Sequence, residues 1–205
     1  MKKIELIGYS GHAFVVLESA MSAGDQVASY YETEEKALNP YGLKYAGRDE
    51  ILSKLEIRSD LFYFIGIGDN RIRKKLFEKF VHLNWTNIID PSAVISSSSK
   101  TGKAIYIGKN ASVNALAEIG TGSIINTGSI IEHECRIGEF VHVAPGTTIC
   151  GNVTVGENTL IGAGTVIRPG IKIGKNVVIG AGSVIVKDIP DQTMAYGSPL
   201  ILKKL

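Results

Sequence analysis

Hydrophobic residues recur every six positions through the second half of the chain. Stepping by six from Ile89 to Ile185 visits 17 positions, and 16 of them hold Ile or Val, with Thr101 as the exception. Ile and Val make up 42 of the 205 residues, so chance would supply only about three or four matches. This hexapeptide repeat predicts short strands and turns that coil into a three-sided parallel β-helix with three hexads per coil and the repeat residues inside.

The residues around each repeat position are restricted as well. Between Ile107 and Ile179 the following residue is Gly seven times and Asn twice. Both types tolerate a left-handed backbone, so we expect the sharp corners of the coil there. No insertion interrupts the repeat, which predicts a continuous rod about 27 Å long at the usual strand spacing. A passive spacer rod is one interpretation, but it gives no reason for an additional N-terminal domain.

The first part of the chain alternates between strand and helix patterns. Strands are predicted at "KKIELIG", "QVASYY" and "LFYFIGIG", and helices at "YSGHAFVVLESAMSAG", around "RDEILSKL" and at "NRIRKKLFEKFV", with a polar loop at 32–47. The βαβαβα order predicts a small parallel, Rossmann-like sheet. We therefore expect an α/β domain at residues 1–85 and a β-helix domain with a C-terminal tail at 86–205.

Composition narrows the functional classes. The formal net charge is only +2 and no run of Lys or Arg exceeds three residues, which argues against nucleic acid or a charged membrane as the main partner. Neither a signal peptide nor a membrane-spanning stretch is evident, so we expect a cytoplasmic protein. The two cysteines, Cys135 and Cys150, lack metal-ligand spacing, and we expect no metal and reduced, structural thiols.

Two glycine turns follow predicted strands at the same edge of the sheet. The first contains Ser10 and Gly11 and the second contains Gly68, while Glu32 ends the second strand. Backbone N–H groups at a helix start can hold an anion, so these residues predict a ligand crevice at the carboxyl edge. The pattern "GYSGHA" is not a dinucleotide fingerprint, and a packing role for the turn, including His12, stays open.

Two of the four histidines lie in "SIIEHECRIGEFVHVAPG", residues 129–146. His133 is outside the inward phase of the repeat, and an imidazole there suits a general base that accepts a proton near neutral pH. A carboxylate at Glu134 could orient the ring, provided that a corner brings two neighbouring side chains together. His133 as a solvated corner residue and His142 as an interface residue are the alternatives. Cys135 occupies a small inward position and is expected in the core.

The chain resembles a group of bacterial hexapeptide transferases, the nucleotide-amino-sugar N-acetyltransferases of the bacillosamine and perosamine type, which are grouped with sialic acid O-acetyltransferases. The resemblance rests on "GYSGHA", "FIGIGDNRIRKKL", "NTGSIIEHECRIGEFVHVAPG" and "DIPDQTMAYGSP". It implies a left-handed β-helix, a homotrimer, acetyl-CoA bound between adjacent β-helices and a nucleotide sugar bound to the N-terminal domain.

The resemblance also implies roles for individual residues. His133 matches the catalytic base and Glu134 the residue that orients it. The acetyl-CoA contacts match Asn126, His142, Gly151, Ala163 and Ala181. The sugar-nucleotide contacts match Ser10, Gly11, His12, Glu32, Thr33 and Gly68, although relatives often carry an Asp-Asp pair where Glu32 and Thr33 stand.

These observations predict an N-acetyltransferase that uses acetyl-CoA without a metal. The expected acceptor is the 4-amino group of a nucleotide-linked 4-amino-4,6-dideoxy sugar, with UDP as the expected nucleotide and direct transfer in a ternary complex. O-acetylation of a sialic-acid-like sugar by the same fold is the first alternative. A non-catalytic scaffold that binds sugar nucleotides, with no affinity for CoA, is the second.

Overall fold

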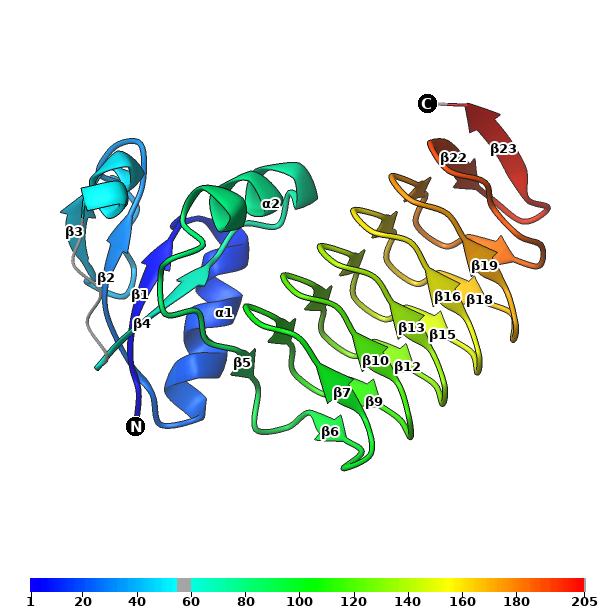
Figure 1. The fold of residues 1–205 in the computed structure, drawn as a ribbon, viewed down its shortest axis with the longest axis horizontal. Helices are drawn as coiled ribbons and strands as arrows, with labels where there is room; N and C mark the ends of the chain where they lie inside the picture. Colours follow the sequence, from blue (N-terminus) through cyan, green and yellow to red (C-terminus); the bar gives the residue numbers. More distant parts are fainter. Residues whose placement is uncertain (55–59, 205) are drawn as a thin grey trace.

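The structure is a computed structural model that describes residues 1–54 and 60–204. An α/β domain of sheet and helices lies at one end, and a β-solenoid extends from it to the C-terminus (Figure 1). The predicted order of an α/β domain followed by a β-helix is confirmed.

The N-terminal sheet has four parallel strands rather than the three expected. β1 (Lys3–Ile7) lies between β2 (Gln26–Tyr31) and β4 (Leu61–Ile65), and β3 (Lys44–Gly47) adds an edge strand beside β2. The end of the predicted polar loop is therefore a strand. The segment "RDEILSKL" begins as a 3₁₀ helix, η1 (Asp49–Lys54), and not as an α-helix, and its last residue, Leu55, lies outside the described residues.

Each face of this sheet is covered. α1 (Gly11–Ser22) lies between the sheet and the solenoid, and its buried residues, such as Val16 and Leu17, share one core with Tyr106 and Ile124 of the solenoid. The opposite face packs against η1 and α2 (Asn70–Lys79). The two domains thus share a hydrophobic core, which holds the turns at the carboxyl edge of the sheet at a fixed place on the solenoid.

The solenoid contains seventeen two-residue strands, β5–β21, which form three faces. Face A contains β5, β8, β11, β14, β17 and β20, face B contains β6, β9, β12, β15, β18 and β21, and face C contains β7, β10, β13, β16 and β19. Each strand pairs with the strand three hexads further on, as in Glu118 with Arg136. β22 (Thr193–Tyr196) and the antiparallel β23 (Ile201–Lys204) close face A at its C-terminal end.

The bounds of these strands follow the hexad. They are Ile88–Ile89, Val94–Ile95, Lys100–Thr101, Tyr106–Ile107, Ser112–Val113, Glu118–Ile119, Ile124–Ile125, Ile130–Ile131, Arg136–Ile137, His142–Val143, Thr148–Ile149, Thr154–Val155, Leu160–Ile161, Val166–Ile167, Lys172–Ile173, Val178–Ile179 and Val184–Ile185. From Ile107 onward the second residue of each strand is buried, and small residues such as Cys135 and Thr147 are fully buried between strands. The predicted inward columns and the core position of Cys135 are confirmed.

The corners are built differently from the prediction. From Thr101 to Ile179 the left-handed residue is the third after each repeat residue, for example Asn110, Glu134 and Asn152, with φ of 56°, 59° and 57°. The glycines directly after the repeat residues lie against the next coil: a Cβ on Gly138 would sit 2.8–3.0 Å from backbone atoms of residues 155–157. The expectation that these glycines supply the left-handed corner is therefore wrong, since they are needed for close backbone approach.

Candidate active site

His133 and Glu134 form a pair at the corner between faces B and C. The left-handed backbone of Glu134 turns its side chain toward His133, and its Oε2 lies 3.1 Å from the Nδ1 of the ring. Both side chains are 58% exposed. The corner thus meets the condition that sequence analysis set for contact between these neighbours, and His133 is not a core residue.

The ring of His133 lies across the next coil at Gly151. A Cβ on Gly151 would stand 2.5 Å from both Cε1 and Nε2 of the ring, closer than any real contact. The glycine therefore leaves the space that the imidazole occupies, which links two residues that the resemblance assigned to catalysis and to acetyl-CoA. The Nδ1 atom faces Glu134, so the Nε2 atom is the one free to meet a substrate.

His142 lies elsewhere on the solenoid. It follows His133 by half a coil, and belongs to β14 on face A rather than to the corner between faces B and C. Its Nδ1 is 3.2 Å from the Gly68 carbonyl oxygen, and its Nε2 is 3.1 Å from Nδ2 of Asn126. Within one chain the structure therefore brings together Asn126, His142 and Gly68, but not His133 and His142.

His12 belongs to the His142 group and not to the first glycine turn. Its ring centroid is 6.0 Å from that of His142 and meets the Tyr106 ring edge-on at 5.5 Å. Its Nε2 is buried without a hydrogen-bond partner. Burial, with smaller contributions from His142 and Arg73, lowers the pKa of His12 to about 3. Burial and Arg73 lower the pKa of His142 to about 4. Both rings are neutral at pH 7.

A hollow of about 380 Å³, the junction hollow, opens beside His142 between the solenoid and the turn before α2. Leu160 and Val178 are apolar members of its lining, and Asn70, Asn158 and Asn176 are amide-bearing members. It is lined by Gly68, Asp69, Asn70, Arg71, His142, Asn158, Leu160, Asn176 and Val178.

A second hollow of about 340 Å³, the nucleotide-side hollow, lies at the carboxyl edge of the N-terminal sheet. Ser10 precedes α1 without capping it through its side chain, so the N–H groups of that helix start remain available to an anion. The carboxylate of Glu32 accepts hydrogen bonds from the N–H groups of Tyr9 and Thr33, at 3.3 and 3.0 Å. The lining residues are Ile7, Gly8, Ser10, Tyr31, Glu32, Thr33, Asp49, Ile67, Ile72 and Leu76.

The predicted crevice therefore forms only in part. Ser10, Glu32 and Thr33 line the nucleotide-side hollow, and Gly11 begins the adjoining helix. Gly68 lies instead in the junction hollow, whereas Ile67 of the same glycine turn lines the nucleotide-side hollow together with Gly8 and Ser10. Ile67 and Ile72 line the nucleotide-side hollow and residues 68–71 line the junction hollow, so this short segment is shared by both.

Ala163 and Ala181 lie one coil apart after strands of face A, at the corner between faces A and B. His133 and Gly151 lie at the other edge of face B. The residues matched to the acetyl-CoA contacts therefore occupy both edges of face B.

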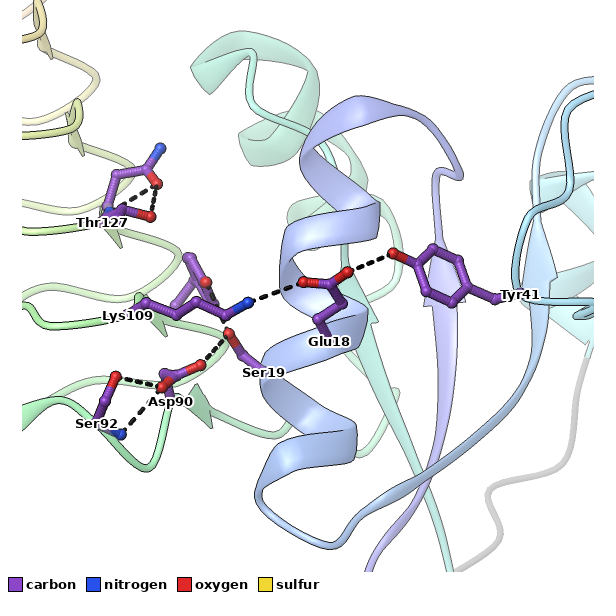
Figure 2. A network of polar contacts seen from close by, with 9 residues as sticks. Glu18, Ser19, Tyr41, Asp90, Ser92, Lys109 and Thr127 are labelled. Atoms are coloured by element: carbon purple, nitrogen blue, oxygen red, sulfur yellow. Dashed lines mark hydrogen bonds and ion pairs between the residues drawn. The ribbon is translucent and has the colours of Figure 1, made fainter.

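A polar network fixes the junction of α1 with the solenoid (Figure 2). The Ser19 hydroxyl donates to Oδ2 of Asp90 at 2.7 Å, and Ser92 donates to the other carboxylate oxygen at 2.6 Å. On the exposed side, Glu18 accepts from Lys109 and from the Tyr41 hydroxyl, both at 2.8 Å. Sequence analysis did not find this network, because its members are spread over residues 18–109.

Arg73 is the most conspicuous residue that sequence analysis missed. Its side chain is 1% exposed, although it lies in the basic segment "NRIRKK". Burial lowers the pKa of its guanidinium to about 9, which leaves the group charged at neutral pH.

Among the described residues, no group of three or more His, Cys, Asp and Glu side chains could hold a metal ion, and no helix is long and apolar enough to cross a membrane.

Comparison with known proteins supports the same division of the chain. Residues 3–80 match the family model of the PglD N-terminal domain, and residues 152–187 match that of the bacterial transferase hexapeptide. A curated UDP-N-acetylbacillosamine N-acetyltransferase from Bacillus subtilis is 32% identical over 111 residues, 52% of this chain. The matches cover between 24% and 51% of the length of the curated relatives.

Solved structures match over nearly the whole chain. PerB from Caulobacter crescentus, in complex with CoA and GDP-perosamine, is 37% identical with a TM-score of 0.92, covering 99% of this chain and 98% of that one. The acetyltransferase domain of PglB from Neisseria gonorrhoeae, in complex with acetyl coenzyme A, is 31% identical with a TM-score of 0.92, covering 100% and 99%. The chain therefore belongs to the hexapeptide-repeat family of perosamine and bacillosamine N-acetyltransferases.

Proposed function

We propose that the protein transfers the acetyl group of acetyl-CoA to the 4-amino group of a nucleotide-linked 4-amino-4,6-dideoxy sugar. The observation that carries the proposal is the His133–Glu134 pair, with Nε2 of the ring directed away from its carboxylate partner and across Gly151. A relative of 37% identity binds both CoA and a nucleotide amino sugar, GDP-perosamine, and variants of one of its histidines were crystallised with the same two ligands.

The chemistry requires one proton acceptor. The free amine attacks the thioester carbonyl, a C–N bond forms and the C–S bond breaks, and the amine proton passes to Nε2 of His133 and then to the departing CoA thiolate. Glu134 holds the Nδ1–H tautomer and stabilises the imidazolium that forms. General base catalysis of this kind contributes about 10²–10⁴ in rate.

The acceptor and the acyl donor have separate places in this scheme. The nucleotide occupies the nucleotide-side hollow, with its diphosphate at the start of α1 beside Ser10 and with Glu32 and Thr33 at its rim. Acetyl-CoA extends along the C-terminal coils, where Leu160 and Val178 line the junction hollow together with His142. The sugar lies between them.

A homotrimer completes the site. His133 and His142 lie on opposite sides of one coil, which supports a site that is shared between neighbouring protomers. Face B carries outward apolar side chains that are 36–69% exposed: Val94, Ile130, Val166 and Val184. Packing face B around a threefold axis would bury these side chains and place the His133 corner of one protomer beside the Ala163 corner of the next.

The experiment is an acetyl-transfer assay that follows free thiol release with acetyl-CoA and a panel of UDP-, dTDP- and GDP-linked 4-amino sugars. The panel also decides the nucleotide, for which UDP is the sequence-based expectation. Release with an amino sugar and not with a sialic acid supports N-acetylation. Thiol release only with a sialic acid would replace the proposal by the O-acetyltransferase alternative. If the protein has no affinity for CoA and releases no thiol with any acceptor, the non-catalytic scaffold that binds sugar nucleotides is the remaining alternative.

A further inference from the structure

The Arg73 guanidinium uses all of its donors on groups from both domains. Nε donates to the Gly122 carbonyl at 2.6 Å and Nη2 to the Phe140 carbonyl at 3.3 Å, both on the solenoid. Nη1 donates to the carbonyls of Ile67 and Gly68, at 3.1 and 3.0 Å, and Nη2 also donates to Oδ1 of Asn70 at 2.8 Å. Five N–H groups thus make five hydrogen bonds, the full capacity of an arginine.

This arrangement is unusual for a buried charge. None of the ion pairs among the described residues includes Arg73, and four of its five acceptors are backbone carbonyls. Burying a cation without a bonded carboxylate is unfavourable, so hydrophobic residues would serve mere packing of α2 better. The guanidinium fork of Arg73 must therefore have a role, beyond packing, that depends on its hydrogen bonds.

The Gly68 carbonyl indicates this role, because it accepts hydrogen bonds from two side chains. It accepts from Nη1 of Arg73 and also from Nδ1 of His142. The Thr127 N–H donates to Oδ1 of Asn126 at 2.8 Å, which places the Asn126 amide nitrogen toward Nε2 of His142. His142 must then accept at Nε2 and donate from Nδ1, which is the neutral Nδ1–H tautomer.

We propose that Arg73 is a positioning residue that holds the Gly68 carbonyl in place and thereby fixes the tautomer and orientation of the His142 ring beside the Asn126 amide. The resemblance matches His142 and Asn126 to acetyl-CoA contacts, so the position of this ring bears on the acyl donor. The same fork sets where the segment Ile67–Ile72, which is shared by the two hollows, lies on the solenoid. Arg73 acts through these groups and touches neither substrate. The kinetic part of the inference rests on the proposed acetyl transfer.

The test uses the full-length protein with Arg73→Lys, which keeps the charge but has at most three donors, and Arg73→Gln. Lys75→Gln is the matched control, because Lys75 is exposed on the same helix. We expect kcat to fall about 10–100-fold for both Arg73 variants, as for a misplacement on the order of 1 Å. KM for acetyl-CoA and for the sugar nucleotide should stay within about threefold of wild type, and Lys75→Gln should leave all three constants unchanged.

A double-mutant cycle and a spectrum separate positioning from general destabilisation. In a His142→Gln background, Arg73→Lys should lower kcat by less than about twofold further, because both substitutions break the same series of hydrogen-bonded groups. Two-bond ¹⁵N–¹H correlation spectra should show His142 as the Nδ1–H tautomer in wild type and as a tautomer mixture in Arg73→Gln. If Arg73→Lys does not fold, Asn70→Ala, which removes one of the five acceptors, should show the same pattern at about two- to fivefold.

An unchanged His142 spectrum in Arg73→Gln would overturn the inference, and so would additive effects of Arg73→Lys and His142→Gln on kcat. A drop in melting temperature with unchanged kcat per folded protein would also overturn it, by showing a purely structural role. If wild type acetylates no amino sugar, the proposed function fails, and the tautomer spectra alone decide the role of Arg73.

Discussion

The imidazole of His133 occupies the space that a side chain at Gly151 would take. The two residues lie one coil apart, and a Cβ on Gly151 would come within 2.5 Å of the ring. An exposed side chain can move away at small cost, so the consequence of filling this space falls on the orientation of His133 and not on the fold.

Gly151→Ala should therefore lower activity without lowering stability. We expect kcat to fall about 10- to 100-fold as the ring is displaced from the corner, and the melting temperature to change by less than about 2 °C. Gly138→Ala is the contrasting control, because its Cβ would meet backbone atoms of the next coil and should destabilise the protein. A Gly151→Ala variant that turns over normally would contradict the placement of His133 in the site.

His133→Ala should abolish most of the turnover. The expected loss is about 10²–10⁴-fold in kcat, the usual contribution of a general base, with an unchanged melting temperature because the side chain is 58% exposed. Glu134→Gln should cost less, since the amide can still accept a hydrogen bond from the ring. Thiol release under saturating substrates measures both variants, and near-normal rates in His133→Ala would remove His133 from the mechanism.

Two inactive variants should restore activity when they are mixed. If His133 of one protomer works beside His142 of the next, a refolded mixture of His133→Ala and His142→Ala contains intact sites. Random assembly of a cyclic trimer gives about a quarter of the sites both wild-type residues. Each variant refolded alone is the control. Absence of any recovery in a mixture that forms mixed trimers by mass spectrometry would show that each site lies within one chain.

The stability of the protein should fall as the pH drops from about 6.5 toward 4.5. His12 and His142 have pKa values lowered to about 3 and about 4 in the folded state, whereas a histidine in the unfolded chain has a pKa near 6.5. Between these values the unfolded chain binds more protons, so stability rises with pH in that window. The carboxylates of Glu18 and Asp90 have lowered pKa values, so they stabilise the fold above the pKa of the unfolded chain, near 4, and this stabilisation is lost only as the pH falls below that value.

Thermal melts between pH 4.5 and 7.5 measure this dependence. The slope should be clearly smaller in His12→Gln than in wild type, whatever the absolute stability of the variant. His82→Gln serves as a control outside the junction, since its ring contacts the Leu52 carbonyl. Equal slopes in wild type and His12→Gln would refute the buried, neutral state of His12.

The junction of α1 with the solenoid should weaken when Ser19 loses its hydroxyl. Ser19→Ala leaves Oδ2 of the 4% exposed Asp90 without its closest donor, and such a loss costs about 1–3 kcal/mol. Ser22→Ala, exposed near the end of the same helix, is the control. Urea unfolding should separate the two variants; the same midpoint for both would mean that the Ser19–Asp90 contact adds nothing to the joint.

The sequence predicted the solenoid well because its pattern is repetitive and local. A six-residue period specifies which side chains point inward, and the same pattern recurs in every coil. The same regularity misled the interpretation of the glycines, since Gly138 and its equivalents are needed for contact with the following coil, and sequence spacing alone does not distinguish this from a left-handed corner.

The candidate site was predictable only where its members are neighbours in sequence. His133 and Glu134 stand side by side, and the corner confirmed their contact. Arg73 was missed because the segment "NRIRKK" has the pattern of a solvated basic helix, in which a buried arginine is not expected. A signal did exist, because Arg73 is three and four residues from Leu76 and Phe77, on the packed side of α2. The edge strand β3 was missed because its four residues, "KYAG", carry no run of apolar side chains.

Because each strand pairs with the strand three hexads further on, equivalent residues along the solenoid axis are separated by whole numbers of coils. Between His142 and the closing strand β22 there are three steps along face A, each about 4.8 Å. Evolution can lengthen or shorten that distance only by whole coils, because any other insertion would turn the inward columns outward. The reach of a ligand that extends from His142 to the closing hairpin is consequently selected in discrete increments.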